Sequence, residues 1–421
     1  MEMEQITAVG IFIVVLVAII SEKVHRTVAA LGGAVLLITL GIMTLKDSVE
    51  AIDFNTIGVL LGMMLFVGVV KCSGLFEYLA IKSAKITKAD PWRLMVAFII
   101  ITAVLSAFLD NVTTVLLVGP MTITICKMLD VELFPYLMTQ ILASNIGGTA
   151  TLIGDPPNIM IGSVADLSFI DFIKMNGSVI IVVLIATIIC FKVLYGSKLH
   201  VTEIARQKVM ALDEGEAIKD IALFRKSLIM IGLVVLAFIM HSALHVESNT
   251  IALSAGFIMM LIGRQDIEEV VHSVEWTTIL FFIFLFIIVG GMNHVGIISK
   301  LAEIIMDVTE GRMVMTMLIL LWASAIISSI LDNIPFVATM IPILMTMQAN
   351  GIDVYPLWWS VSLGACLGGN GTLIGASANV VLSGIGSRNG CEITFARFFK
   401  IGFPMMLLSI VICTVYLLII F

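Results

Sequence analysis

The sequence predicts an all-α polytopic membrane protein made of two repeats that lie in opposite orientations in the membrane. Three observations lead to this prediction. The chain has 421 residues, of which 60% are apolar and only 13% charged, too few charges to cover a soluble protein of this size. Long apolar runs recur with short polar interruptions. A polar pattern placed inside these runs occurs once in each half of the chain.

The repeated pattern has two parts. In the first, Leu109-Asp110-Asn111 is followed by Pro120, and Leu331-Asp332-Asn333 with Pro342 matches it 222 residues later. In the second, residues 147–158 (GGTATLIGDPPN) match residues 368–379 (GGNGTLIGASAN) at an offset of 221. Weaker matches extend toward the start of each half. The duplication therefore covers nearly the whole chain.

The apolar runs predict about ten transmembrane helices, five in each half. The first half, 1–195, has them near 6–20, 27–45, 56–70, 135–173 and 177–195, and the second, 227–421, near 227–243, 250–263, 276–292, 356–388 and 401–420. Runs 135–173 and 356–388 contain the polar glycine-rich segments, so we expect two broken helices there. Because five is an odd number, the second repeat must enter the membrane inverted.

Two further pairs of apolar runs, 94–109 with 111–128 and 313–331 with 333–347, have no connecting loop. Only Asp110-Asn111 or Asp332-Asn333 separates the arms, and no interfacial residues surround them. We therefore expect two re-entrant hairpins. Full crossing of each arm would add two spans per half and leave the sidedness of every later loop unchanged.

The distribution of basic residues predicts the orientation. When successive loops are assigned alternately to the two faces of the membrane, 19 of the 23 lysines and arginines lie on one face. Only Lys46, Lys174, Lys300 and Arg312 lie on the other. By the positive-inside rule the first face is cytoplasmic, so both termini lie outside. The protein is expected in the cell membrane, which is the plasma or inner membrane. The mixed-charge segment 196–226 is then a cytoplasmic linker, helical in part. Residues 73–88 have the pattern of a basic amphipathic helix at the cytoplasmic interface.

Asp110 and Asp332 need a physical explanation, because a carboxylate between apolar arms is costly unless it is protonated, paired or bound to a cation. One explanation is N-capping of the second hairpin arm. The other is a shared ion or substrate site, since both tips reach the midplane from opposite sides. Na⁺ is a candidate ligand at Asp110, Asn111, Asp332 and Asn333, and Thr113 and Thr114 add hydroxyls.

The two glycine-rich segments predict unwound membrane helices whose backbone carbonyls become available, as suits Na⁺. A simple packing bend through small residues is the alternative. The candidate substrate- or ion-binding residues are Asp110, Asn111, Thr114, Asn145, Gly147, Gly148, Thr149, Thr151, Gly154, Asp155, Asn158, Asp332, Asn333, Gly368, Gly369, Asn370, Thr372, Gly375 and Asn379.

The halves differ where Asp155-Pro156-Pro157 faces Ala376-Ser377-Ala378. Asp155 could cap the following helix, because Asp followed by proline is a good helix start. It could equally carry a proton, as intramembrane acids often do. Both interpretations stay open at this point.

Other classes of function find little support. The six cysteines form no C-x-x-C pair, and the six histidines form no metal-binding pattern, so no cofactor is expected beyond a coupling Na⁺ or H⁺. No Walker A loop is present, and nothing indicates a nucleic-acid partner. An intramembrane aspartyl protease would need Tyr-Asp on one helix and Gly-x-Gly-Asp on another, but leucine precedes both Asp110 and Asp332, and Leu152 stands in the place of the first glycine before Asp155. A channel would need a continuous polar pore, and inverted repeats favour alternating access instead.

The motifs Leu109–Thr114, Asn145–Asn158 and Leu331–Phe336 resemble those of the ion transporter superfamily, in the branch of ArsB-type arsenite permeases, NhaD-type sodium/proton antiporters and the P protein, with a citrate transporter-like domain. The resemblance covers essentially the whole chain. It implies a homodimer that moves a transport domain by an elevator-like mechanism, and for some arsenite permeases a soluble ATPase partner. Related dicarboxylate transporters carry Ser-Asn-Thr at the hairpin tips, where this chain has Asp110-Asn111 and Asp332-Asn333.

We therefore expect a secondary active transporter, not an enzyme. It would move a small inorganic ion or anion, such as arsenite or antimonite, coupled to H⁺ or Na⁺. A Na⁺/H⁺ antiporter and a carboxylate symporter are alternatives, although two aspartates at the tips would repel a carboxylate unless protonated or cation-bound.

The charge split predicts the outcome of cysteine labelling. A thiol introduced at Gly215 in the linker should react with a membrane-impermeant maleimide only after the cells are opened, whereas one at His245 should react in intact cells. Labelling of the linker from outside intact cells would contradict this topology.

Overall fold

The computed structural model describes residues 3–21, 23–309 and 311–421, and these residues form helices and no β-strand. The helices of the first half are α1 (Met3–Ser21), α2 (Arg26–Thr39), α3 (Leu45–Glu50), α4 (Phe54–Lys71), α5 (Leu75–Ile86), α6 (Pro91–Phe108), α7 (Asn111–Leu129), α8 (Leu133–Thr149), α9 (Pro156–Ala165), α10 (Phe169–Phe172) and α11 (Ser178–Tyr195), with a π-helical turn at Ile173–Gly177.

The linker contains α12 (Glu203–Met210). The helices of the second half are α13 (Ile221–Leu244), α14 (Ser248–Gly263), α15 (Ile267–His272), α16 (Trp276–His294), α17 (Ile297–Thr309), α18 (Met313–Ile330), α19 (Asn333–Ala349), α20 (Tyr355–Gly368), α21 (Ser377–Arg388) and α22 (Phe395–Ile420). Each of them corresponds to a helix of the first half about 222 residues earlier. The series begins with α13, which corresponds to α1, and ends with α22, which corresponds to α10 and α11 together.

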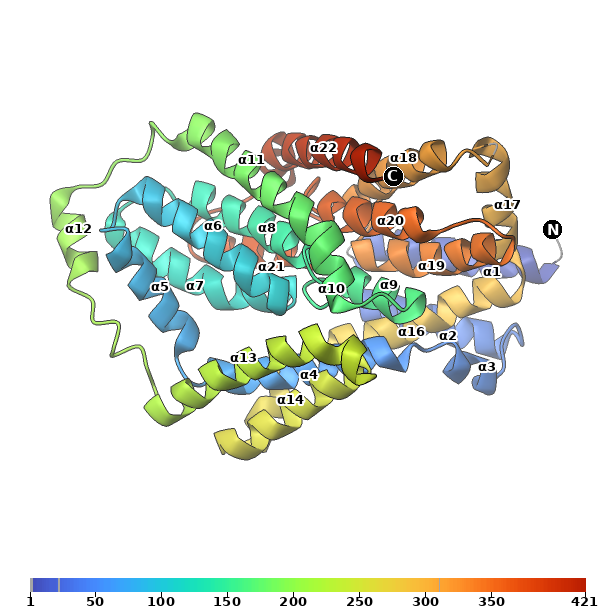
Figure 1. Cartoon of the computed structure of the whole chain (residues 1–421), viewed down its shortest axis with the longest axis horizontal. Helices are drawn as coiled ribbons and strands as arrows, with labels where there is room; N and C mark the ends of the chain where they lie inside the picture. Colours follow the sequence, from blue (N-terminus) through green and yellow to red (C-terminus); the bar gives the residue numbers. More distant parts are fainter. Residues whose placement is uncertain (1–2, 22, 310) are drawn as a thin grey trace.

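The packing of the two halves repeats in the same way. Helix α4 packs on α14 as α16 packs on α2, and α6 packs on α8 as α18 packs on α20. The second parts of the broken helices exchange partners, because α9 packs on α19 and α21 packs on α7. Figure 1 shows the α6–α7 and α18–α19 hairpins approaching the centre of the molecule from opposite ends. The inverted orientation in the membrane predicts this arrangement.

The expected spans agree with the helices. In the described part of the chain, nine helices are long and apolar enough to cross a membrane, and α2, α14 and α19 are shorter apolar helices. Three of the nine, α6, α7 and α18, are hairpin arms. The fold class of an all-α polytopic membrane protein is therefore confirmed. The re-entrant placement of the hairpins stays a prediction.

Some helix ends differ from the expected runs. Helix α2 ends at Thr39 and not at 45, because Gly41 adopts a left-handed backbone (φ 74°) and the amides of Gly41 and Ile42 close the last turn onto Ile38 and Leu37. Helix α13 begins at Ile221, inside the expected linker, since the Asp220 side chain caps it by accepting from the amides of Ala222 and Leu223.

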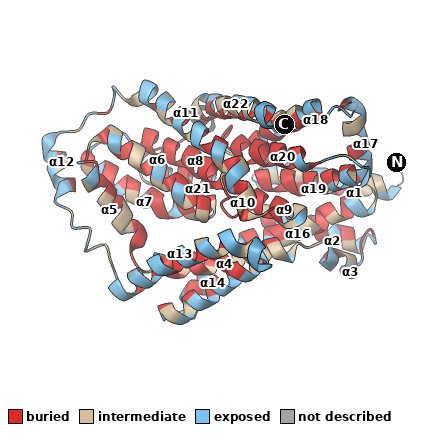
Figure 2. Ribbon diagram, in the orientation of Figure 1, coloured by how far each residue is buried: buried red, intermediate tan, exposed pale blue. Residues whose placement is uncertain are grey.

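The helices form two bundles. We call α6–α11 and α18–α22 the hairpin bundle, and α1–α4 with α13–α16 the flanking bundle. In Figure 1 the hairpin bundle occupies the upper part and the flanking bundle the lower part, except for α1, which lies at the height of α19. Figure 2 shows that burial is most complete in α8, α9 and α20 of the hairpin bundle, whereas α13 and α14 have large exposed faces. Those exposed faces carry apolar side chains such as Leu233, Leu236 and Phe257. A lipid-facing surface is expected to be apolar in this way.

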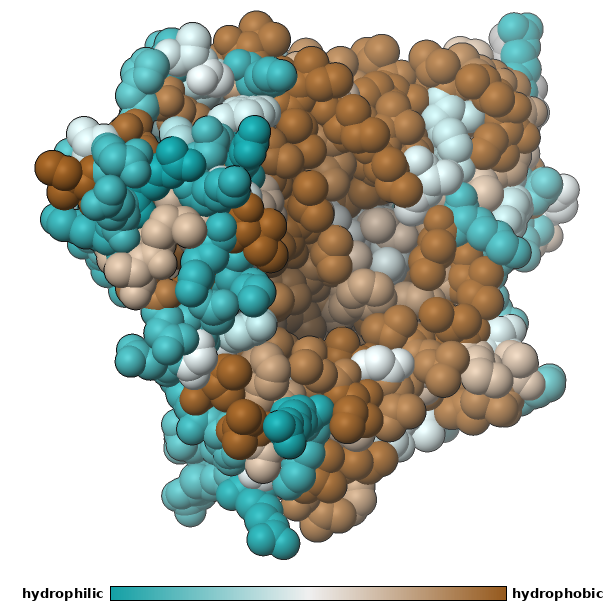
Figure 3. Space-filling model, turned by 60° about the vertical axis from the view of Figure 1, so that its left-hand side comes forward, coloured by the Kyte–Doolittle hydropathy of each residue, from teal (hydrophilic) through white to brown (hydrophobic). Residues whose placement is uncertain are grey.

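The linker docks on α5. Glu214 forms ion pairs with Lys85 and, at 3.2 Å, with Lys82, and Lys219 reaches Glu77 at 3.2 Å. Hydrogen bonds from the side chain of Lys85, a backbone amide and Lys82 lower the pKa of Glu214 to about 2. Figure 3 shows hydrophilic groups gathered at this end of the molecule, beside a broad hydrophobic surface. The expected helix over 73–88 is thus confirmed as α5.

Glycines set the close approach of the broken helices to the hairpins. A Cβ on Gly147 would lie 2.1 Å from the Ala103 carbonyl oxygen, and one on Gly368 would lie 2.7 Å from the Ala325 carbonyl oxygen. The contacts of α8 on α6 and of α20 on α18 therefore require glycine at these positions.

We predict that Gly147→Ala lowers the stability of the detergent-solubilised protein by about 1–3 kcal/mol or more, because the added methyl meets backbone atoms that cannot move aside. Thermal unfolding measures the effect. Gly232→Ala is the matched control, since it lies inside α13 with nothing within 4 Å of its Cβ. Equal melting temperatures for the two variants would contradict the packing role.

Candidate functional site

Four segments meet at the centre of the molecule. They are the tips of the two hairpins, at Asp110 and Asp332, and the interruptions of the two broken helices, between α8 and α9 and between α20 and α21. The structure thus brings together the two polar patterns of both repeats, as the sequence analysis expected.

Both hairpin-tip aspartates cap the second arm of their hairpin. An Asp110 carboxylate oxygen accepts from the Thr113 amide at 2.8 Å, and an Asp332 carboxylate oxygen accepts from the Ile334 amide at 3.1 Å. The Thr113 hydroxyl also donates to Asp110. Such caps satisfy amides that would otherwise be unpaired at the start of α7 and α19. The capping interpretation is confirmed, and ion binding by the same carboxylates stays a prediction.

Asp332 has a second partner that sequence reasoning missed. The Arg26 guanidinium donates to Asp332 Oδ2 at 3.1 Å, to the Thr278 hydroxyl at 3.1 Å and to the Ser377 hydroxyl. The Ser377 hydroxyl donates to Asp332 at 3.0 Å. Arg26 was counted among the cytoplasmic loop charges, but its side chain is only 22% exposed and lies against the site. The sequence signal was weak, since Arg26 simply begins an apolar run.

Asp155 lies between the two hairpin tips. The Asn111 side-chain amide donates to Asp155 Oδ1 at 3.4 Å, and the Asn333 amide donates to both carboxylate oxygens at 3.2 Å. Asp155 is completely buried, and no basic side chain in the described part of the chain forms an ion pair with it. Its side chain makes no capping bond to α9. The structure therefore does not support the capping interpretation of Asp155.

Buried asparagines link the two repeats across the centre. The Asn111 amide donates to Asn145 Oδ1 at 3.2 Å. The Asn145 amide donates in turn to Oδ1 of Asn370 and of Asn379, at 2.9 Å each. All four side chains are at most 4% exposed. Such a network is stable only if each member keeps its partners, because an unpaired amide is costly at this depth.

Asn158 and Asn379 close the two helix interruptions. The Asn158 amide donates to the carbonyls of Thr149 and Thr151 at 3.1 and 2.9 Å, and the Asn379 amide to the carbonyls of Gly369 and Thr372 at 2.7 and 2.9 Å. These are carbonyls that the sequence analysis expected to be available for Na⁺. In this structure an asparagine of the same repeat occupies them.

The threonines of the interruptions tie each one to a hairpin. The Thr151 hydroxyl donates to the Ala107 carbonyl near the end of α6, and the Thr372 hydroxyl to the Ser329 carbonyl near the end of α18. The Thr149 hydroxyl donates to the Asn145 carbonyl at 2.7 Å within α8. The Thr114 hydroxyl, by contrast, is buried without a hydrogen-bond partner among the described residues. It is the candidate residue with an unused polar atom.

The glycines of the pattern act through close approach. A Cβ on Gly154 would lie 2.5 Å from the Ser106 carbonyl oxygen, and one on Gly148 would lie 2.6 Å from the Gly154 carbonyl oxygen. In the second repeat, a Cβ on Gly375 would lie 2.8 Å from the Gly369 carbonyl oxygen, and one on Gly369 3.1 Å from the Ala376 Cβ. These positions let the interruptions fold tightly beside the hairpin tips.

A cavity of about 20 Å³, large enough for one water molecule or a small ion, lies among Asp110, Asn111, Asp155 and Asn333. A second cavity of about 440 Å³ adjoins it and reaches Asp332. The two cavities share five lining residues, Arg26, Val112, Glu275, Thr278 and Ser377. Glu275, Thr278 and Ser377 were, like Arg26, not among the expected site residues. The larger cavity gives an approach to the centre from one side.

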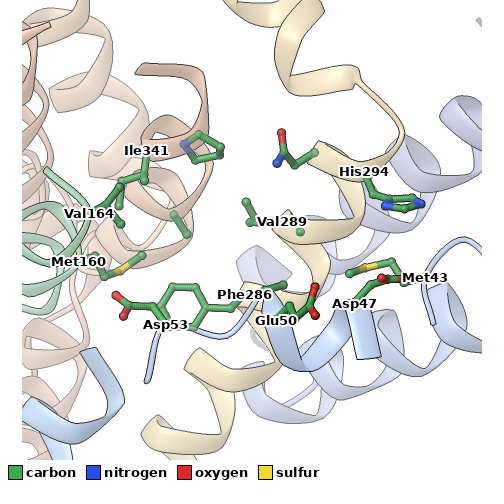
Figure 4. A pocket seen from close by; sticks show the side chains of 15 residues that line it. Met43, Asp47, Glu50, Asp53, Met160, Val164, Phe286, Val289, His294 and Ile341 are labelled. Atoms are coloured by element: carbon green, nitrogen blue, oxygen red, sulfur yellow. The ribbon is translucent and has the colours of Figure 1, made fainter. Parts of the chain in front are cut away.

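The boundary between the two bundles holds further cavities. One of about 480 Å³ lies beside Asn55, Ser163 and His241. The helices around it correspond, in the other repeat, to helices around the cavity at Asp332, but no hairpin-tip residue lines it. Another of about 350 Å³ lies between α9 and α19 on one side and α3 and α16 on the other. Figure 4 shows Met160, Val164 and Ile341 facing Met43 and His294 across it. Both cavities therefore lie along the boundary between the two bundles.

Comparison with known proteins gives the class of this molecule. Residues 16–364 match the family model described as "Citrate transporter", so the chain belongs to the citrate transporter family. It is therefore a multi-pass membrane transporter and not a protease or other enzyme.

Individual relatives agree with this assignment. The chain is 41% identical over 420 residues to an uncharacterized transporter of Mycobacterium tuberculosis, covering 98% of this chain and 97% of that protein. It is 34% identical to the P protein of Homo sapiens over 95% of this chain, which spans 58% of that longer protein. The crystal structure of the Alcanivorax borkumensis YdaH transporter is similar in fold, with a TM-score of 0.61 at 14% identity, over 88% of this chain and 86% of that one.

We predict that Asn158→Ala destabilises the protein by about 3 kcal/mol or more, because it leaves the carbonyls of the first interruption without their buried donor. The Ser362 hydroxyl, which donates to Asn158 Oδ1 at 2.6 Å, would also lose its acceptor. Thermal unfolding in detergent measures the loss. The control is Asn350→Ala, an exposed asparagine after α19, which should unfold near the parent temperature.

Proposed function

We propose that the protein is a secondary active transporter of the cell membrane, driven by a gradient of H⁺ or Na⁺, in which Asp155 binds the coupling cation. The observation that carries this proposal is the position of Asp155. It is a fully buried carboxyl group held between Asn111 and Asn333 of the two hairpin tips, and none of the described residues supplies it with a cationic partner. A carboxylate in such a place requires a proton or a cation.

The surrounding residues suit a cation that enters and leaves. Asn111 and Asn333 donate hydrogen bonds from their side-chain amides to the Asp155 carboxylate. Rotation of an amide by half a turn would present its oxygen instead, without a change of shape. Oxygen ligands are what a hard cation such as Na⁺ prefers. The small cavity beside Asp155 has room for one such ion.

The transported substrate is, in this proposal, a small inorganic ion or anion such as arsenite or antimonite. Asp110, Asp155 and Glu275 line the small central cavity, and Arg26 is the single basic side chain that lines it among the described residues. This balance of charge favours a neutral or cationic species. Arsenite would then bind as neutral arsenous acid, and Na⁺/H⁺ antiport is the nearest alternative. The family match favours a second candidate, a citrate-like carboxylate, which would need a cation to offset the aspartates.

The division into two bundles supports an elevator-like mechanism. The hairpin bundle carries Asp155 and both tips, while the flanking bundle presents large apolar faces. Cavities of about 350 and 480 Å³ lie along the boundary and leave room for displacement. A homodimer formed through the flanking bundle is part of this proposal, and so is a plasma-membrane location with the linker in the cytoplasm. A soluble ATPase partner would be needed only if gradients fail to drive transport.

Flux in proteoliposomes tests the proposal. Imposed Na⁺ and pH gradients should each be screened with arsenite, antimonite, citrate and ²²Na⁺ as substrates. Uptake that follows one of the two gradients is expected. Uptake of every substrate at the same rate without either gradient would contradict secondary active transport.

We predict that Asp155→Asn reduces gradient-driven uptake about 10- to 100-fold and removes its pH dependence, because asparagine keeps the shape of the side chain but binds neither H⁺ nor Na⁺ strongly. Uptake as a function of pH measures the effect. Asp353→Asn, at an exposed aspartate before α20, is the control and should transport like the parent. A pH profile of Asp155→Asn that matches the parent would transfer the coupling role to another group.

The same assay separates the hairpin-tip aspartates. Asp110→Asn and Asp332→Asn keep the helix caps, since asparagine is as good an N-cap residue as aspartate. Loss of coupled uptake in either variant would therefore identify a cation-binding carboxylate, whereas normal coupled uptake would leave that aspartate with its capping role.

A further inference from the structure

The two hairpin tips correspond in the repeat but differ in their partners. Asp332 is paired with Arg26 at 3.1 Å, whereas Asp110 contacts Thr113 and has no basic partner among the described residues. The position that corresponds to Arg26 in the second half is Ser248, which cannot supply a cation to Asp110. The duplicated site is therefore asymmetric in charge.

Arg26 connects the two bundles. It is the first residue of α2 and bonds to Thr278 of α16, both in the flanking bundle. Its guanidinium carbon lies 5.1 Å from the centre of the Phe281 ring, also on α16. Its other bonds cross the boundary to Asp332 at the tip of α19 and Ser377 at the start of α21. Movement of the hairpin bundle must break these two crossing bonds.

Arg26 also stands between the two cavities. It lines the 440 Å³ cavity that reaches Asp332 and the 20 Å³ cavity beside Asp155. Asp332 is 11% exposed and Arg26 22% exposed, so a small ion in the larger cavity has access to the pair. A cation that arrives there meets Asp332 with its charge already matched by the arginine.

We propose that Arg26 is a tethered cation that occupies Asp332 while this site is empty, and that a mobile monovalent cation, H⁺ or Na⁺, replaces it there before the hairpin bundle moves. This inference rests on the proposed cation-coupled transport. It makes Asp332 a second cation site, distinct from Asp155, whose occupancy controls the contact between the bundles.

The physical reason is that a half-buried carboxylate is costly without a partner. Separation of Arg26 from Asp332 with nothing to replace it leaves the carboxylate unpaired, so the empty transporter is held in place. A proton or Na⁺ on Asp332 removes that penalty and frees Arg26 to stay with Thr278 and Phe281 on α16. Because the guanidinium and the mobile cation exclude each other, binding of the cation and release of the contact are linked.

Other titratable groups face the pair and belong in any test of pH. His25 precedes Arg26 on the same helix end, and Glu275 precedes α16 and lines both cavities. Asp110 and Asp155 lie on the side of the small cavity. Variants of Arg26 and Asp332 must therefore be compared singly and together, so that the effects of these neighbours cancel.

The experiment measures access to the larger cavity. Val380 of α21 lines it and is 41% exposed, so Val380→Cys provides a thiol there, in a background with the two half-buried native cysteines, Cys72 and Cys190, changed to serine. The rate of maleimide labelling is followed in membranes while Na⁺ is varied at constant pH and pH is varied at constant Na⁺. In the parent, one of the two cations should lower the rate about fivefold or more.

Arg26→Gln should give the lowered rate without any added cation, and so should Asp332→Asn. The double variant should equal either single one, because both remove the same contact. Arg26→Lys, which keeps the charge, should retain part of the cation response. Lys23→Gln, which removes an exposed charge from the same loop, should behave like the parent. Labelling that fails to respond in the parent, or effects of the two variants that add, would overturn the inference.

The result is independent of the test of Asp155. With Asp155→Asn, uptake should be lost while the labelling response at Val380→Cys persists, since Arg26 and Asp332 are unchanged. If the parent showed normal gradient-driven uptake but no labelling response, the Asp332 site alone would be overturned, and the proposed function would stand.

Discussion

The structure depends on one constraint: the backbone polar groups at the two helix interruptions need hydrogen-bond partners in the interior of a membrane protein, where little water is available. In a bilayer each unpaired carbonyl costs several kcal/mol, so a helix can break only where the chain supplies donors. Asn158 and Asn379 do so, each turning its amide back onto the carbonyls that the break releases. With the breaks closed in this way, the starts of α9 and α21 are fixed beside the hairpin tips.

This fixed geometry is nearly the same in both repeats, but the residues placed on it are not. The N-cap position of α9 is Asp155 and that of α21 is Ala376. The first residue of α2 is Arg26 and that of α14 is Ser248. Duplication therefore supplies a symmetric frame, and a few substitutions give it one central carboxylate and one paired carboxylate. The two hairpin tips can then have different chemical roles.

The sequence alone predicted the repeat, the hairpins, the two interruptions and the long apolar helices, because apolar length and glycine-rich breaks are local signals. It did not predict α3, α15 or α17, which are short or only partly apolar. It also selected Asp155, Asn111, Asn145, Asn333, Asn370 and Asn379, which the structure brings together. It did not find Arg26, because that contact joins residues 306 positions apart and depends on where α2 begins. The carbonyls expected to be free likewise accept hydrogen bonds from an asparagine seven to ten residues further along the chain, Asn158 or Asn379.

The exchange of partners between the repeats, with α9 on α19 and α21 on α7, has a consequence for biosynthesis. When the first repeat has been inserted, α9 lacks α19 and α20, Asn145 lacks Asn370 and Asn379, and Asp155 lacks Asn333. Those groups have to stay hydrated or be held by the insertion machinery until the last helices arrive. The nascent first half is thus an obligatory intermediate that cannot mature alone, and its lifetime is set by the time needed to translate the second half.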